Sequence, residues 1–184
     1  MILRMLDNEE VSALYRDEMR RDFPLEELKS LQVIHNLLNE KRYEAFGAFE
    51  NGREVGYALM YLPGSRIVLL DYLAISPDAR NHGEGKKLME CIRKRYAQKA
   101  DAIVIECEDP SFEASPLDAE RRIHFYEQLG AKDTGVTVFL YDVEYRILYL
   151  AAKGECTPVT KDEIMELYTG MLQPKEFVEK CMIH

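Results

Sequence analysis

Apolar residues recur along this chain with two different spacings, and each spacing indicates one kind of element. Continuous or alternating apolar runs predict strands over residues 2–6, 43–49, 55–62, 66–75, 101–107, 136–141 and 145–151. Apolar positions three or four residues apart predict helices over residues 8–19, 24–38, 86–97, 116–129 and 161–168, with a short last helix from residue 174. This order of elements is typical of an α/β protein with a mixed sheet.

Local signals predict where several of these helices begin. Asp7 followed by Glu10 forms a capping box, in which each side chain accepts a hydrogen bond from a backbone N–H group at the helix start. Thr160 with Glu163 repeats this pattern near the C-terminus. Pro24 favours the first turn of a helix, so we expect the second helix to begin there.

Two further signals predict how the strands pair. Asn51-Gly52 separates two strand-like runs, and this dipeptide is a strong signal for a β-hairpin. The run from Ile67 to Ile75 is almost entirely apolar, which is typical of a central strand covered by helices on both faces. One helix connects this run to the strand Ala102–Cys107, and we therefore expect these two strands to lie parallel.

The composition limits the classes of function. Of the 184 residues, 47% are hydrophobic and 31% are charged, which predicts one globular domain or one domain with an appendage. The formal charge of −9 disfavours nucleic acid or an anionic membrane as a partner and favours cationic small molecules. We expect no signal peptide and no membrane span, because no apolar stretch is long enough. The four cysteines lack Cys-x-x-Cys spacing, so we expect reduced thiols, a cytoplasmic location and no bound metal.

The segment that follows the strand ending at Ile75 is the strongest candidate for binding chemistry. Gly83 and Gly85 stand where a helix begins, and the first backbone N–H groups of a helix can bind an anion. Arg80 and Lys86 add positive charge, and His82 adds a hydrogen-bond donor. The spacing excludes the Walker phosphate loop, and it excludes the dinucleotide fingerprint because a leucine occupies the place of its third glycine.

The pattern Arg80-x-x-Gly83-x-Gly85, after a strand that ends Leu73-Ala74-Ile75, resembles the acetyl-CoA signature of the GNAT superfamily of N-acetyltransferases. A second segment, residues 123–131, resembles that superfamily's helix with a tyrosine four residues before a glycine. The resemblance implies a GNAT-like α/β fold, with a mixed and mostly antiparallel sheet splayed at the central parallel pair and helices on both faces. It implies an N-acetyltransferase domain over residues 1–152 and leaves residues 153–184 as a C-terminal helical extension.

The same resemblance implies where acetyl-CoA would bind. Pantetheine would pair with the backbone of Leu73 and Ile75, the Leu73 N–H would reach the acetyl carbonyl, and the pyrophosphate would lie on the amides of residues 81–86. The cofactor-binding set comprises Leu73, Ala74, Ile75, Arg80, Asn81, His82, Gly83, Glu84, Gly85, Lys86, Lys87 and Tyr126.

The implied reaction is direct transfer of an acetyl group to an amine, in which a base and an acid assist. Tyr126 stands at the family position that protonates the leaving thiolate. The base stays open between Asp71, Glu106, Glu108 and a chain of water molecules. The glutamate that the family often carries on the first of the two parallel strands falls at Leu69 here, which cannot titrate.

The acceptor is expected to be an amine of a cationic small molecule or a peptide. An acidic cleft could recognise it, built from Glu26, Glu27, Glu108, Asp109 and Glu113. A non-catalytic CoA-binding sensor or interaction module is the alternative. It stays open because of Leu69 and because Ala119 stands where the family often has an asparagine. Residues 153–184 carry many apolar side chains, which either pack on the protein's own sheet or form a partner or dimer surface.

Overall fold

The computed structural model describes residues 1–112 and 115–184. The expected mixed α/β fold is confirmed, with one parallel pair of strands and antiparallel pairing elsewhere. By its contacts the chain divides into two compact units. The first unit comprises Met1–Leu62 and Leu70–Arg95, and the second comprises Pro63–Leu69 and Tyr96–His184.

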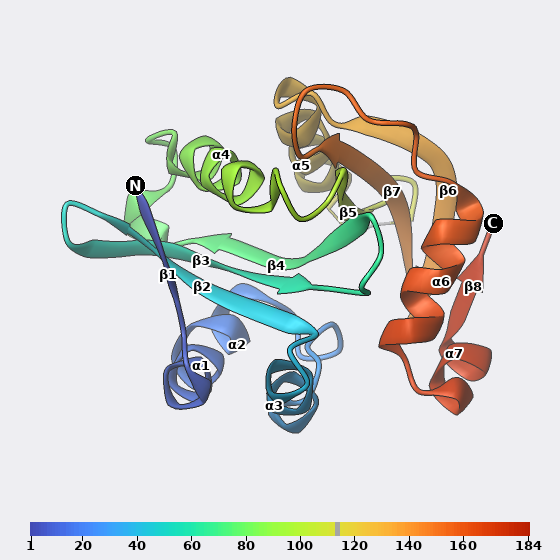
Figure 1. Cartoon of the computed structure of the whole chain (residues 1–184), viewed down its shortest axis with the longest axis horizontal. Coiled ribbons are helices and arrows are strands. Elements are labelled where there is room, and N and C mark those ends of the chain that lie inside the picture. Colours follow the sequence, from blue (N-terminus) through green and yellow to red (C-terminus); the bar gives the residue numbers. More distant parts are fainter. Residues whose placement is uncertain (113–114) are drawn as a thin grey trace. The chain divides into compact units, whose positions relative to one another are not determined.

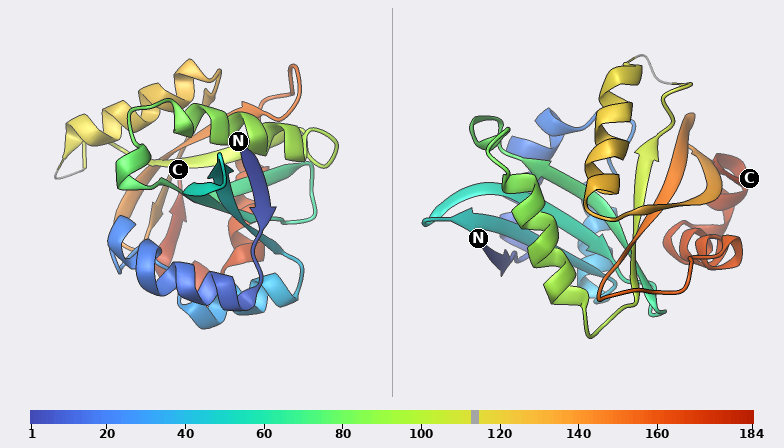
Figure 2. Two further views of the ribbon diagram at one scale, coloured as in Figure 1. Left: turned by 90° about the vertical axis from the view of Figure 1, so that its left-hand side faces the viewer. Right: turned by 90° about the horizontal axis from the view of Figure 1, so that it is seen from above.

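The first unit contains the N-terminal helices and four neighbouring strands. Its elements are β1 (Ile2–Met5), α1 (Asn8–Leu14), the π-helix η1 (Tyr15–Met19), α2 (Arg20–Asp22), α3 (Leu31–Asn39), β2 (Tyr43–Glu50), β3 (Arg53–Tyr61), most of β4 (Ile67–Ile75), the 3₁₀-helix η2 (Pro77–Ala79) and all but the last residue of α4 (Glu84–Tyr96). The strands follow the order β1-β2-β3-β4, and the first two pairs are antiparallel. Helices α1 to α3 cover one face of these strands, and α4 covers the other (Figures 1 and 2).

Of the two helix starts that the sequence predicted in this unit, at Asp7 and at Pro24, one is confirmed and one is wrong. The capping box of Asp7 and Glu10 is confirmed at the start of α1. The prediction that a helix begins at Pro24 is wrong, because α3 begins at Leu31 after Ser30, whose hydroxyl accepts a hydrogen bond from the Val33 N–H. A serine side chain at the N-cap satisfies one of the first N–H groups of the helix.

The hairpin between β2 and β3 is formed as the sequence predicts. Asn51 and Gly52 both have positive φ angles, of 52° and 79°, which a tight hairpin turn of this type requires. On the interior of this unit, Val11, Met19 and Ile34 have no exposed surface. The apolar sides of these helices are therefore buried in the interior of the unit, against its strands.

The second unit contains the remaining strands and the C-terminal helices. Its elements are the first residues of β4, then β5 (Ala102–Glu108), α5 (Pro116–Gln128), β6 (Lys132–Leu140), β7 (Val143–Ala151), α6 (Lys161–Met171), α7 (Pro174–Lys180) and β8 (Cys181–Ile183). The strands follow the order β5-β7-β6-β8 with antiparallel neighbours. Helices α5 and α6 cover opposite faces of these strands (Figure 2).

Residues 153–184 pack within the second unit. Ile164, Leu167 and Tyr168 of α6 have no exposed surface, and the capping box of Thr160 and Glu163 is confirmed at the start of this helix. The short strand β8 pairs with β6 and was not expected from the sequence. The segment therefore adds two helices and an edge strand to this unit.

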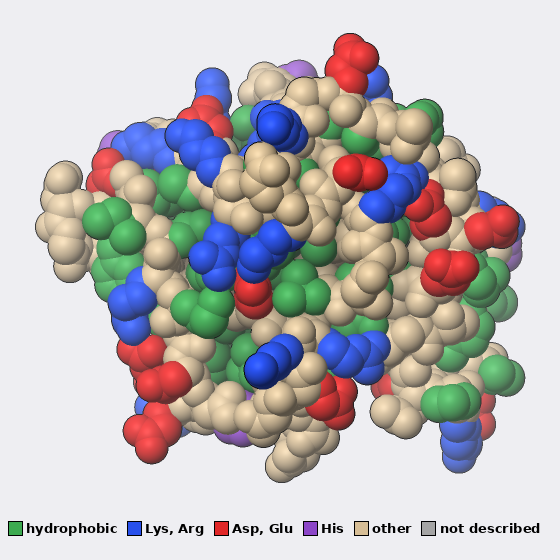
Figure 3. Space-filling model, in the orientation of Figure 1, with side chains coloured by type: hydrophobic (Ala, Val, Ile, Leu, Met, Phe, Trp, Pro, Cys, Tyr) green, Lys and Arg blue, Asp and Glu red, His purple; other side chains and the backbone are tan. Residues whose placement is uncertain are grey.

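The surface carries charges of both signs. On the face shown in Figure 3, Lys and Arg side chains alternate with Asp and Glu side chains, and hydrophobic side chains form small separate patches. In the described part of the chain, no helix is both long and apolar enough to cross a membrane. Within the same residues, no group of three or more His, Cys, Asp or Glu side chains could hold a metal ion.

Candidate active site

The glycine-containing loop connects β4 to α4 in the first unit. Asn81 and Gly83 have positive φ angles of 64° and 80°, and α4 begins at Glu84. A Cβ atom built on Gly83 would meet no other atom within 4 Å, so the backbone conformation rather than crowding favours glycine there. The loop therefore leaves open space in front of the first turn of a thirteen-residue helix, whose N–H groups suit an anion.

The Arg80 side chain connects this loop to two other parts of the first unit, the end of β4 and Asp22. Its Nε donates to the carbonyl oxygen of Ile75 at 3.0 Å, and its Nη2 lies 3.4 Å from Oδ1 of Asp22. Asp22 is buried and also accepts hydrogen bonds from the Tyr57 hydroxyl and the Arg21 guanidinium. The guanidinium of Arg80 is thus committed to shaping the loop.

The lysines of the loop differ in their surroundings. Lys86 is exposed in the first turn of α4. The Nζ of Lys87 lies 3.0 Å from Oε1 of Glu84 and 3.3 Å from Oε1 of Glu50, and these two carboxylates raise the pKa of Lys87. Lys86 is therefore better placed than Lys87 to meet a phosphate.

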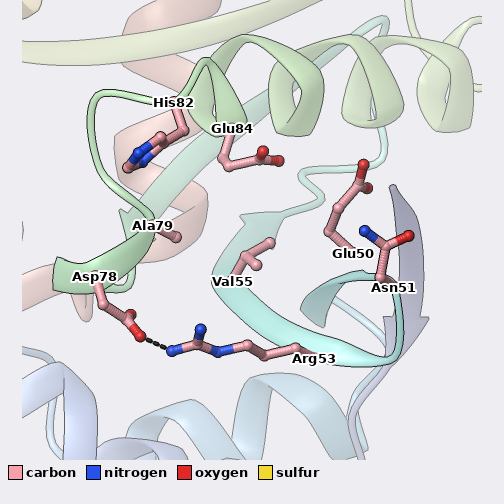
Figure 4. A pocket seen from close by; sticks show the side chains of 8 residues that line it. All are labelled: Glu50, Asn51, Arg53, Val55, Asp78, Ala79, His82 and Glu84. Carbon is pink, nitrogen blue, oxygen red and sulfur yellow. Dashed lines mark ion pairs between the residues drawn. The ribbon is translucent and has the colours of Figure 1, made fainter.

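A pocket lies beside this loop, within the first unit (Figure 4). Its lining side chains come from the β2–β3 hairpin, the segment after β4 and the start of α4, and they are Glu50, Asn51, Arg53, Val55, Asp78, Ala79, His82 and Glu84. Arg53 and Asp78 form an ion pair. The Oε2 atom of Glu84 is buried and has no hydrogen-bond partner among the residues that the structure describes. The three carboxylates of this pocket already pair with Arg53 or Lys87. A pyrophosphate therefore fits the backbone N–H groups of α4 better than this pocket.

Tyr126 lies on α5 of the second unit, with only 6% of its surface exposed. Burial raises the pKa of its hydroxyl far above the usual value, and Cys107 adds to the effect. A neutral hydroxyl keeps its proton and can act as a proton donor.

The three carboxylates considered as a base have different partners. Asp71 on β4 uses both oxygens, since Oδ1 lies 2.8 Å from Lys29 Nζ and Oδ2 accepts from the Tyr43 hydroxyl. Glu106 and Glu108 are both on β5 of the second unit. Glu106 accepts a hydrogen bond from the Tyr168 hydroxyl.

Glu108 forms an ion pair with Arg122 on α5, and it is one of the residues considered for an acidic cleft. Asp109 lies 3.1 Å from Arg146, and the pKa of its carboxyl is lowered mainly by the backbone N–H of Ser111, with help from Arg146. Glu113 lies outside the described residues. The gathering of these carboxylates into one cleft stays a prediction.

The sequence analysis did not predict the residues that form hydrogen bonds or ion pairs with Asp71 and Glu106. Lys29, Tyr43 and Tyr168 carry no motif, and they lie 42, 28 and 62 positions away from the carboxylates that they contact. The one usable signal was Asp71 itself, because a carboxylate in an apolar strand requires a partner.

Comparison with known proteins identifies similarity to acetyltransferases. A sequence model of the acetyltransferase (GNAT) domain matches residues 41–130. YjbC of Bacillus subtilis (strain 168), a protein assigned to the acetyltransferases, is 30% identical over 112 residues. That match covers 61% of this chain and 53% of YjbC, so the chain matches about half the length of this relative.

Solved structures show the same fold. A GNAT-family protein from Bacteroides thetaiotaomicron is 20% identical with a TM-score of 0.65, and the match covers 90% of this chain and 94% of that one. The spermidine N-acetyltransferase of Vibrio cholerae, solved with CoA and spermine, is 12% identical with a TM-score of 0.62, covering 82% and 95%. None of these relatives is described as a non-catalytic binding module, so that alternative gains no support from them.

Proposed function

From the match of residues 41–130 to the acetyltransferase (GNAT) domain, we propose that this chain is a GNAT acetyltransferase, which transfers the acetyl group of acetyl-CoA directly to an amine. One observation carries the proposal. The region that matches the GNAT domain, residues 41–130, includes β4, the glycine loop and the helix with Tyr126. The match thus covers both segments to which we assign a cofactor-binding and a proton-donating role.

In this proposal the backbone holds most of the acetyl-CoA. Leu73, Ala74 and Ile75 of β4 offer backbone groups to the pantetheine amides, as an added strand would. The pyrophosphate lies on the N–H groups at the start of α4, with Lys86 beside it. The open space at Gly83 supports this assignment, because a phosphate needs close access to the backbone.

The reaction requires two proton transfers. The amine nitrogen must lose a proton as it bonds to the acetyl carbon, and the thiolate that leaves when the C–S bond breaks must gain one. We assign the second transfer to the neutral hydroxyl of Tyr126. We assign the first to Glu106, directly or through water, because Asp71 and Glu108 each form an ion pair, with Lys29 and with Arg122.

The acceptor in this proposal is a cationic amine. The chain has a net charge of −9, and the structurally similar V. cholerae protein acts on spermidine, a polyamine. An acidic protein attracts a cationic polyamine or aminoglycoside electrostatically, whereas it repels an anionic amine. We place the enzyme in the cytoplasm, where its thiols would stay reduced.

Two measurements test the proposal. Calorimetry should detect binding of acetyl-CoA, and mass spectrometry should detect acetylated product from a panel of polyamines, aminoglycosides, amino acids and peptides. Detection by mass avoids thiol reagents, which the protein's own free cysteines would consume. Absence of acetyl-CoA binding would refute the proposal, and preference for an anionic acceptor would refute its acceptor class.

Tyr126→Phe tests the assigned acid. We expect kcat to fall about 100-fold or more, because general acid catalysis contributes on the order of 10²–10⁴. The affinity for acetyl-CoA should stay within about twofold, since the ring is retained. Tyr149→Phe is a matched control, because Tyr149 lies on β7 and is also 6% exposed. Equal losses in kcat and in affinity would mean that the hydroxyl only positions the cofactor.

A further inference from the structure

The segment between α2 and α3, residues 23–30 (the α2–α3 loop), is fastened to two consecutive residues of β4. Lys29 Nζ lies 2.8 Å from Oδ1 of Asp71, and the Lys29 N–H donates to the Tyr72 hydroxyl at 2.9 Å. The Tyr72 hydroxyl donates to the carbonyl oxygen of Glu27, also at 2.9 Å. The Phe23 ring packs edge-on against Tyr72, with 5.1 Å between ring centroids. One strand thus holds the loop at its beginning, middle and end.

We propose that Asp71 and Tyr72 are positioning residues, which hold the α2–α3 loop where it recognises the acceptor amine. The role of the loop in recognition rests on the proposed acetyl transfer, whereas the fastening itself does not. Asp71 therefore acts through Lys29 and touches no reacting atom.

The burial of the pair makes this fastening strong. Only 4% of the Asp71 side chain and 16% of the Lys29 side chain are exposed. The Tyr43 hydroxyl completes the coordination of the carboxylate by donating to its second oxygen. A charge left alone in such a place is unfavourable, so the loop cannot leave β4 without exposing or stranding two charges.

Two neighbouring residues of β4 share this loop. Asp71 contacts the Lys29 ammonium, whereas the Tyr72 hydroxyl contacts the Lys29 backbone N–H and the Glu27 carbonyl oxygen. Two side chains of the strand, and not one, therefore hold the same short loop.

The anchored strand also connects the loop to the expected reaction centre. Leu73, whose N–H is assigned to the acetyl carbonyl in the proposed function, directly follows Tyr72 in β4. A loop fixed to these neighbouring residues is held at a constant distance from that N–H group. Small displacements of a bound substrate lower reaction rates strongly, so this constancy favours acceptor binding in one orientation.

A double-mutant cycle with Asp71→Asn and Lys29→Met tests the proposal. In the protein without ligands, hydrogen exchange of the backbone amides of residues 24–30 should accelerate in both single variants and in the double variant. With an acceptor, each variant should raise the acceptor KM about tenfold, and the double variant should again show about tenfold rather than about 100-fold. The values of kcat and of the acetyl-CoA KM should stay within about twofold.

Glu163→Gln provides the control. Glu163 forms an ion pair with Arg66 in the second unit, and its loss should leave exchange in the α2–α3 loop unchanged. Unchanged loop exchange in Asp71→Asn would overturn the proposal, whether or not any acetyl transfer is found. A collapse of kcat in Asp71→Asn with a harmless Lys29→Met would also overturn it and would identify Asp71 as the base. Faster loop exchange without acetyl transfer would refute only the proposed function.

Discussion

Asp71 in the first unit and Glu106 in the second unit are similar carboxylates with different partners. Each lies on a strand among apolar residues, and each accepts a hydrogen bond from a tyrosine hydroxyl, that of Tyr43 or Tyr168. Asp71 also forms an ion pair with Lys29. The same kind of residue, in the same kind of strand, can thus hold a neighbouring loop in one unit and be assigned a proton transfer in the other. The partners, and not the sequence pattern, suggest the role.

The largest expected effect separates the two carboxylates by turnover. We expect Glu106→Gln to lower kcat about 100-fold or more, because an amide cannot accept the proton of the amine. Asp71→Asn should leave kcat within about twofold, because its carboxylate positions a loop. Steady-state kinetics at saturating acceptor measures both. If Asp71→Asn lowers kcat about 100-fold and Glu106→Gln leaves it within about twofold, Asp71 and not Glu106 is the base.

The next largest effect concerns the free energy of unfolding and the ion pair of Asp71. Asp71→Ala leaves the Lys29 ammonium without its partner in a place that is 84% shielded from solvent, since only 16% is exposed. We expect a loss of about 3 kcal/mol in the free energy of unfolding, the range for breaking a buried ion pair. Urea denaturation measures this loss. A change below about 1 kcal/mol, the value typical of an exposed pair, would contradict the fastening of the loop.

The two tyrosines offer a smaller and more selective comparison. Tyr168→Phe removes the hydroxyl that donates to Glu106, and we expect kcat to fall about fivefold, which corresponds to the loss of one hydrogen bond of about 1 kcal/mol. Tyr43→Phe is its matched counterpart on Asp71 and should change kcat less than twofold (about 0.4 kcal/mol or less). Equal effects of the two variants on kcat would remove the distinction between the two carboxylates.

The pH dependence of stability provides the smallest contrast between the units. Burial raises the pKa of Glu54 in the first unit above its ordinary 4.5, so its contribution to stability is present below pH 4.5 and is lost as pH rises through the folded-state pKa. Arg66 lowers the pKa of Glu163 in the second unit, so that contribution is present above pH 4.5 and is lost as pH falls through the folded-state pKa. At neutral pH, Glu54→Gln should therefore stabilise the protein and Glu163→Gln should destabilise it. Urea denaturation between about pH 3 and pH 7 measures both.

The features that the sequence predicted correctly depend on neighbouring residues. The capping box of Asp7 and Glu10, the turn at Asn51-Gly52 and the helix start beside Gly83 all arise from a few consecutive positions. The start of α3 was misplaced because Pro24 and Ser30 are both acceptable local signals. The backbone N–H of Lys29 donates to the Tyr72 hydroxyl of β4, and the helix begins only after this contact, at Leu31.

The candidate site was predictable only in part. The glycine loop and Tyr126 carry recognisable spacing, and the resemblance to a family supplies their roles. The partners of Asp71 and Glu106 could not be predicted, because Lys29 and Tyr168 are ordinary residues brought together with them by the fold. The edge strand β8 has three residues, which is too short for any periodicity to be visible.

The π-helix at Tyr15–Met19 constrains the length of the N-terminal segment. A π-helical segment accommodates an additional residue, and each residue of an α-helix turns the chain by about 100°, so the helix after Met19 is rotated by about that angle. This rotation sets the direction in which Asp22 projects, and Asp22 receives both the Tyr57 hydroxyl and the guanidinium of Arg80. A one-residue deletion within the widened turn would restore a regular helix and point Asp22 elsewhere. We therefore expect this stretch to tolerate insertions and deletions poorly, although no role in the reaction is assigned to it.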